Sequence, residues 1–167
     1  MNKNNTLKEK ILEALKEGDI ASLYVLELQA QEELNEDELH GYYANILDLA
    51  LENLTNILEN HRRANLSDVQ DFATIRALYE YAMEHYSAKD TKSASALFEV
   101  LSGLSEDKTF SNAMKIHQHA TDANISLDDF LDNYADIETT QKEQSFYLSH
   151  FQKKAQNLLK NSQSKGK

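Results

Sequence analysis

The chain has 167 residues, with no proline, four glycines and no cysteine, and its formal net charge is −11 at pH 7. The lack of proline and the shortage of glycine, beside abundant leucine, alanine, glutamate and lysine, favour an all-α protein. The negative charge repels the phosphate backbone of nucleic acids, so we expect no nucleic-acid partner. Without cysteine the chain has neither a disulfide nor a thiolate metal site, which fits a reducing compartment.

Two further absences bear on localisation. The first ten residues, MNKNNTLKEK, contain no apolar stretch, so no signal peptide is visible. No window approaches the roughly 20 apolar residues that a membrane span needs. We therefore expect a cytoplasmic protein that does not insert into a membrane.

Apolar spacing predicts an antiparallel bundle or array of six or seven helices. Residues 1–161 are expected to form a single all-helical domain, and residues 162–167 a disordered tail. The first helix spans about residues 7–17 and begins with a capping box of Thr6 and Glu9. Gly18 and Asp19 then end this helix and begin the next, over about residues 20–33.

The third predicted helix is long, from about residue 36 to residue 63, and Asn35 with Glu38 forms the capping box at its start. Its apolar residues cover two adjacent faces, which requires contacts on two sides. This helix is therefore either an interior helix of the bundle or part of a homodimer interface. The face assigned to the dimer consists of Leu47, Leu51, Leu54 and Leu58.

The middle of the chain, about residues 68–103, reads as two helices folded back on each other. Ser67 and Gln70 are expected to cap the first of these helices, and the turn lies near residues 88–90. Small residues where the two helix axes approach, and a large Phe98 beyond them, suit an antiparallel pair about 8–10 Å apart. The packing residues are Leu78, Tyr81, Ala82, His85, Ala94, Phe98 and Leu101.

After a helix over about residues 108–121, the last helix begins at Ser126 and continues towards Leu158 with a 4-3 apolar spacing. The middle of this stripe is polar, and Thr139 and Thr140 lower the helix propensity there. A single long helix and two helices with a break near residue 139 both remain open.

No constellation of residues indicates catalysis, so we predict a protein that is not an enzyme and has no catalytic residue, metal site or cofactor. A di-iron bundle needs Glu-x-x-His motifs, and none of the six histidines has glutamate three residues before it. There is no cysteine nucleophile, nucleophile elbow or glycine-rich phosphate loop. His117 and His119 point in different directions on one helix, so we expect a surface pair and not a chelate.

A second stripe on the helix of residues 74–87 is a candidate partner-binding face. Its residues recur at i, i+3, i+7 and i+10, on a different face from the packing residues. Tyrosine rings supply contact area, methionine adapts its shape, and hydroxyl and guanidinium groups give direction. Packing of this stripe on a neighbouring helix is the alternative. The candidate residues are Arg76, Tyr79, Met83 and Tyr86.

The segment LYEYAMEHY, followed by ASALF, resembles a tetratricopeptide repeat. Over about residues 65–104 it also resembles the class II chaperones of type III secretion, which hold translocator proteins before export. The resemblance implies a concave helical face, lined by Tyr79, Met83 and Tyr86, that grips a short hydrophobic segment of a client.

The leading hypothesis is a non-enzymatic protein-binding module, a cytoplasmic chaperone or adaptor that captures an apolar segment of a protein or peptide partner. The resemblance implies that the captured protein is a client of a secretion system. The alternative is a homodimeric helical scaffold that associates through its leucine face or through the stripe of its last helix.

Overall fold

The computed structural model describes residues 6–165, and side chains as far as residue 159. This part of the chain is all-α: it forms ten helices and no strand, which confirms the predicted fold class. The count exceeds the predicted six or seven because two of the expected helices are interrupted. The helices are α1 (Leu7–Glu17), α2 (Ile20–Val25), α3 (Glu27–Glu33), α4 (Glu36–Glu59), α5 (Val69–Ser87), α6 (Thr91–Leu104), α7 (Lys108–Asp122), α8 (Leu127–Asn133), α9 (Ile137–Lys142) and α10 (Lys153–Lys165).

The chain divides into two compact units, and the boundary between them falls inside α5. Unit 1 runs as far as Ala77 and unit 2 begins at Leu78. Whether they behave as the single domain predicted from the sequence stays a prediction. Of the predicted tail, residues 162–165 belong to α10, and residues 166–167 lie outside the described part of the chain.

In unit 1 the helix ends follow the local sequence signals. The Asn35 side chain and Glu38 form the predicted capping box, with both hydrogen bonds present. Gly18 closes α1 in the left-handed region, with a φ of 66° that glycine adopts at little cost. Asp19 then accepts a hydrogen bond from the Ser22 N–H and begins α2. These side chains satisfy backbone groups that a helix end leaves without partners.

Two predicted helices of unit 1 end earlier than expected. The helix expected over residues 20–33 divides at Leu26. There the Leu23 carbonyl accepts from the Leu26 N–H and also from the buried hydroxyl of Tyr42 on α4, which closes α2 after six residues. The helix expected to reach residue 63 ends at Glu59, and His61 turns the chain away with a φ of 52°.

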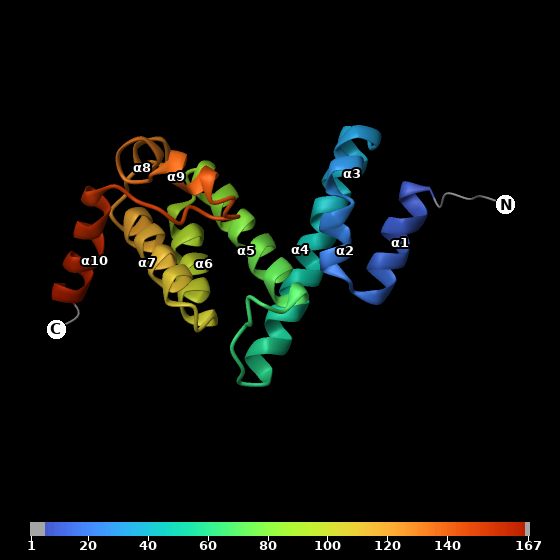
Figure 1. Ribbon diagram of the computed structural model, residues 1–167, viewed down its shortest axis with the longest axis horizontal. Coiled ribbons are helices and arrows are strands. Elements are labelled where there is room, and N and C mark those ends of the chain that lie inside the picture. The colour runs from blue at the N-terminus through green and yellow to red at the C-terminus, as the bar shows by residue number, and fades with distance from the viewer. Residues whose placement is uncertain (1–5, 166–167) are drawn as a thin grey trace. The chain divides into compact units, whose positions relative to one another are not determined.

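Unit 2 contains the antiparallel pair α6 and α7, with α10 packed on α7 (Figure 1). The predicted helix–turn–helix of residues 68–103 is present as α5, a turn at residues 88–90, and α6. Asp90 caps α6 by accepting from the Ser93 N–H. The ring of Phe98 lies 6.2 Å from that of Tyr79 and 6.4 Å from that of Tyr86, measured between centroids, so aromatic side chains of the two helices contact each other.

Of the two alternatives for the last predicted helix, the single long helix is wrong, because the segment divides into α8, α9 and α10. Backbone hydrogen bonds pair residues 134–136 with residues 150–152. The Asp136 N–H donates to His150, and the Gln152 N–H donates to Tyr134, both at 2.8 Å. The helix is interrupted on both sides of α9, and residue 139, the predicted position of the break, lies inside α9. Asp136 caps the start of α9 by accepting from the Thr139 N–H.

Candidate functional site

Two of the residues predicted to line a groove belong to the interior of unit 2. Tyr79 is 4% exposed and Tyr86 is 2% exposed, while Met83 is half-buried. The Tyr86 hydroxyl donates to the Ile125 carbonyl at 2.6 Å. In this structure the packing alternative describes both tyrosines, since neither side chain is open to a partner.

Tyr79 belongs to a chain of hydrogen bonds centred on His117. The Leu148 N–H donates to the Tyr79 hydroxyl at 3.1 Å, and that hydroxyl lies 2.9 Å from Nε2 of His117. Nδ1 of His117 lies 2.6 Å from the Ala113 carbonyl, which can only accept, so Nδ1 carries the proton and Nε2 accepts from Tyr79. Both ring nitrogens are therefore occupied.

The expected surface position is wrong for His117, which is fully buried, whereas His119 is half-buried. Aromatic rings enclose the imidazole, with those of Phe98 at 4.9 Å and Phe130 at 5.1 Å between centroids. Burial lowers the pKa of His117 to about 4. A neutral imidazole with both nitrogens bonded is neither a free base nor a metal ligand, so we assign it to the packing of unit 2.

The fourth predicted residue, Arg76, lies in unit 1 and has different neighbours. Its guanidinium pairs with the Glu27 carboxylate at 2.9 Å and lies over the ring of Tyr24, 4.0 Å from the centroid. The predicted residues therefore have different surroundings: Tyr79 and Tyr86 are buried in unit 2, whereas Arg76 lines a groove of unit 1.

That groove of unit 1 is the best candidate for a binding site. Its volume is about 470 Å³, within the range of pockets that hold ligands. Several apolar side chains on it face solvent: Val25 is 83% exposed, Val69 66% and Phe72 39%. We call it the α2–α5 groove, and its lining residues are Ala21, Tyr24, Val25, Leu66, Ser67, Val69, Phe72, Ala73 and Arg76.

A glutamine clamp sets the spacing between the two helical walls of the groove. Gln70 on α5 accepts from the Ala21 N–H at 3.2 Å and donates to the Asp19 carboxylate at 2.6 Å. Hydrogen bonds from the Ser22 side chain and from Gln70 lower the pKa of Asp19, so this carboxylate stays charged at neutral pH. The prediction that Ser67 and Gln70 cap α5 is wrong. Asp68 accepts from the Gln70 and Asp71 N–H groups, and Gln70 turns to α2.

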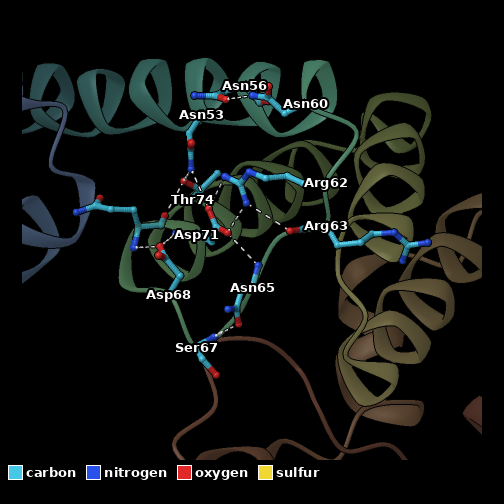
Figure 2. A network of polar contacts seen from close by, with 11 residues as sticks. Asn53, Asn56, Asn60, Arg62, Arg63, Asn65, Ser67, Asp68, Asp71 and Thr74 are labelled. Carbon is cyan, nitrogen blue, oxygen red and sulfur yellow. Dashed lines mark hydrogen bonds and ion pairs between the residues drawn. The ribbon is translucent and has the colours of Figure 1, made fainter.

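The third wall comes from the loop of residues 60–68, and a polar network holds this loop (Figure 2). Arg62 binds the Asp71 carboxylate through two hydrogen bonds, of 2.8 and 3.1 Å. The same carboxylate accepts from the Asn65 N–H at 2.9 Å, and Asn53 on α4 donates to Thr74 at 2.7 Å. The network fixes the loop that carries Leu66 at the edge of the groove.

Asp71 is the buried charge of this network, with 4% of its surface exposed. Burial alone raises the pKa of its carboxyl, but hydrogen bonds from Arg62, Asn65 and Asn53 outweigh that effect and the pKa lies below its usual value. Among the described residues every buried side-chain nitrogen or oxygen has a hydrogen-bond partner. We therefore interpret the network as a structural support for the groove.

Chemically, the α2–α5 groove offers apolar contact area with one ion pair at its edge. Among the described side chains, residues 6–159, no three histidine, aspartate or glutamate residues gather where they could hold a metal ion. In the same part of the chain no helix is both long enough and apolar enough to cross a bilayer.

Most of the groove could not be located from the sequence. Tyr24 and Val25 lie outside the helical spacing of Leu23, Leu26 and Ala30, and large apolar residues outside such a stripe are the signal that could identify an exposed face. Leu66 lies between two predicted helices and carries no such signal. The chain itself matches no protein-family model, no curated protein and no solved structure.

Proposed function

We propose that this chain is a non-enzymatic protein-binding module, a cytoplasmic chaperone or adaptor, and that its α2–α5 groove captures an apolar segment of a partner protein. The observation that carries the proposal is the exposure of Val25 and Val69 on the walls of a groove of about 470 Å³. Exposed apolar surface that lines a concavity is typical of sites where another chain docks.

The rest of the groove suits such a partner. The Tyr24 ring and the Phe72 ring supply flat contact area, and the Arg76–Glu27 pair gives the groove a charged, polar edge. The Gln70 clamp and the Arg62–Asp71 pair hold the walls before a partner arrives, which lowers the entropy lost on binding.

The α5–α6 hairpin supports the finer proposal of a tetratricopeptide-like protein related to the secretion chaperones. In this version the groove replaces Tyr79, Met83 and Tyr86 as the surface that grips the client, because those tyrosines belong to the interior of unit 2. Export of the client by a secretion system is part of the same proposal.

Site-specific photo-crosslinking tests the proposal. A photoreactive amino acid replaces Val25, and in a matched control it replaces Val100, an apolar residue of unit 2 that is 40% exposed. We expect a discrete crosslinked partner in native lysate at position 25 only, lost when Val69→Asp is added. The same crosslinks at both positions, or none at position 25, contradict the proposal.

A further inference from the structure

A segment outside the helices, residues 145–152, crosses unit 2 between α9 and α10, where Figure 1 draws it as an irregular red stretch. We call this segment the strap. Its residues 145–151 are half-buried, whereas Phe110, His117 and Phe130, which contact its rings, are each 0% exposed. The strap therefore lies on the unit with one side covered and the other side open to solvent.

Three aromatic side chains anchor the strap. The rings of Phe146 and Tyr147 lie 6.0 and 5.0 Å from the ring of Phe110, measured between centroids. Further along the strap, the ring of Phe151 lies 5.9 Å from that of His117. Aromatic rings at such distances attract one another beyond the effect of the area that they bury. The surface under the strap is therefore suited to receive aromatic side chains.

Hydrogen bonds hold the backbone of the strap as they would hold a docked peptide. The Tyr79 hydroxyl accepts from the Leu148 N–H at 3.1 Å. The Thr140 hydroxyl accepts from the next two N–H groups of the strap, at 3.3 and 3.2 Å. The Gln152 N–H donates to the Tyr134 carbonyl at 2.8 Å. In peptide recognition, such main-chain bonds give affinity and the sites for particular side chains give specificity.

The two ends of the strap favour its release. Just before it, Gln144 has a φ of 56°, in the left-handed region that is costly for residues other than glycine. Just after it, α10 packs on α7, and of the described side chains of α10, residues 153–159, only Ala155 is buried. Because few buried contacts hold this end of the chain, local opening costs less than unfolding of the whole unit.

We propose that the strap is a displaceable occupant of a binding surface on unit 2, and that a partner protein replaces it with a non-helical segment of the same chemistry. Such a segment carries two adjacent aromatic residues and a third one four positions further on, as Phe146, Tyr147 and Phe151 do. It has no proline at the positions of Leu148 and Gln152, because their N–H groups are bound. The closed strap lowers the apparent affinity for the partner, since only the open fraction of molecules binds it.

The proposal is independent of the α2–α5 groove, which belongs to unit 1. Hydrogen exchange of the wild-type chain tests whether the strap opens by itself. The amide hydrogens of Leu148 and Gln152 should exchange about tenfold faster, or more, than the most protected amides of α7, because local opening frees only the strap. Equal protection of the strap and α7 would show that both open only when the unit unfolds, and would overturn the proposal.

A peptide with the sequence of the strap, SFYLSHFQ, blocked at both ends, is the binding probe. Its control carries proline at the position of Leu148. In the full chain, Phe146→Ser/Phe151→Ser weakens the closed strap and should raise the affinity for the probe by about tenfold or more. The same variant should bind the proline peptide about tenfold more weakly than the probe, because one main-chain hydrogen bond is lost.

Two further variants locate the binding. Thr140→Val, added to the strap variant, removes the hydroxyl that accepts from two strap N–H groups and should weaken the probe by about threefold or more. Val100→Ser, at an exposed residue of α6 in the same unit, is the matched control and should bind the probe as weakly as wild type does. Circular dichroism verifies that all variants stay helical.

Three results of the binding tests would overturn the proposal. The strap variant binds the probe no better than wild type does; it binds the proline peptide as tightly as the probe; or sedimentation finds a wild-type dimer that the strap variant converts to a monomer. In the last case the occupant is the strap of a second copy. The exchange experiment uses only the wild-type chain, so it decides the matter even where a variant fails to fold.

Discussion

In unit 2 five large aromatic side chains are buried, whereas in unit 1 several large apolar side chains lie on the surface. Tyr79, Tyr86, Phe98, Phe110 and Phe130 of unit 2 are each at most 4% exposed. Of the nine exposed large apolar side chains in the described part of the chain, seven belong to unit 1, the unit that contains the α2–α5 groove. Those seven are Leu12, Val25, Leu28, Leu51, Leu58, Val69 and Phe72.

An aromatic stripe on a helix and an interaction surface therefore need not coincide. Aromatic residues at helical spacing in unit 2 build a core around His117. In unit 1 the Arg62–Asp71 pair and the hydrogen bond from Gln70 to Asp19 hold the helices in place, and several large apolar side chains stay exposed to solvent. Four predictions test this division.

The largest effect is expected from Tyr86→Ala in unit 2. Removing a buried aromatic side chain should lower the free energy of unfolding by about 3–5 kcal/mol, measured by urea denaturation. The Ile125 carbonyl also loses the hydrogen bond from the tyrosine hydroxyl. A variant as stable as wild type would mean that Tyr86 is a surface residue, as the groove prediction required.

Acid should weaken unit 2 through His117. Its pKa of about 4 in the folded protein lies below the ordinary value of 6.5, so the unfolded chain binds the proton more readily. The stabilising effect of a neutral His117 is complete above pH 6.5 and is lost as the pH falls towards 4, by up to roughly 3 kcal/mol. Burial also lowers the pKa of His119, which acts in the same direction. Urea titrations between pH 7 and pH 4.5 measure the slope.

The control for the acid effect is His117→Gln, whose side chain does not titrate in this range. Its stability should depend less on pH over the same interval. An equal slope in both proteins would show that His117 is not the responsible group. Carboxylates such as Asp71, whose pKa lies below its usual value, lose their stabilising effect only at lower pH.

A smaller loss of stability is expected when the Arg62–Asp71 pair of unit 1 is removed. Asp71→Asn removes the charge that Arg62 binds and should lower the free energy of unfolding by about 2 kcal/mol, since hydrogen bonds to charged groups contribute about 1.5–3 kcal/mol. The measurement is urea denaturation at pH 7. The loop should also exchange its amide hydrogens faster, most visibly at Asn65, which donates to Asp71. Unchanged exchange at Asn65 would contradict the network.

The smallest effect is expected at the exposed apolar residues of unit 1. Val25→Ser and Leu58→Ser should each change the free energy of unfolding by no more than about 0.5 kcal/mol, because substitutions at exposed positions leave the core intact. Thermal and urea denaturation measure this. A loss of more than about 2 kcal/mol at either position would show that the side chain is part of a core.

Several helix boundaries could be predicted from the sequence, because a cap depends on residues close together in the chain. The capping box of Asn35 with Glu38 and the boundary at Gly18 and Asp19 are examples. The cap of α5 could not, because Gln70 reaches α2 and Asp68 takes its place. In the last predicted helix a break near residue 139 could be anticipated from Thr139 and Thr140, but the two actual interruptions, before and after α9, could not. They depend on residues 134–136 pairing with residues 150–152, and nothing in the 4-3 spacing announces that pairing.

The candidate site was harder to predict than the fold. The burial of Tyr79 depends on Leu148, 69 residues further along the chain, and on His117. The spacing of Tyr79 and Tyr86 on one helix is the same whether a partner or a neighbouring segment covers them. The α2–α5 groove combines α2, a loop and α5, and its geometry depends on Gln70 reaching Asp19, 51 residues away.

The most direct test is the dissociation constant of the partner identified by crosslinking, measured for two double variants. We expect Val25→Asp/Val69→Asp to weaken binding by about thirtyfold or more, equivalent to about 2 kcal/mol, because charge enters the apolar walls of the groove. Tyr79→Phe/Tyr86→Phe keeps the buried rings and should bind as wild type does. Full binding by the valine variant, with binding lost in the tyrosine variant, would contradict the account and place the site on unit 2.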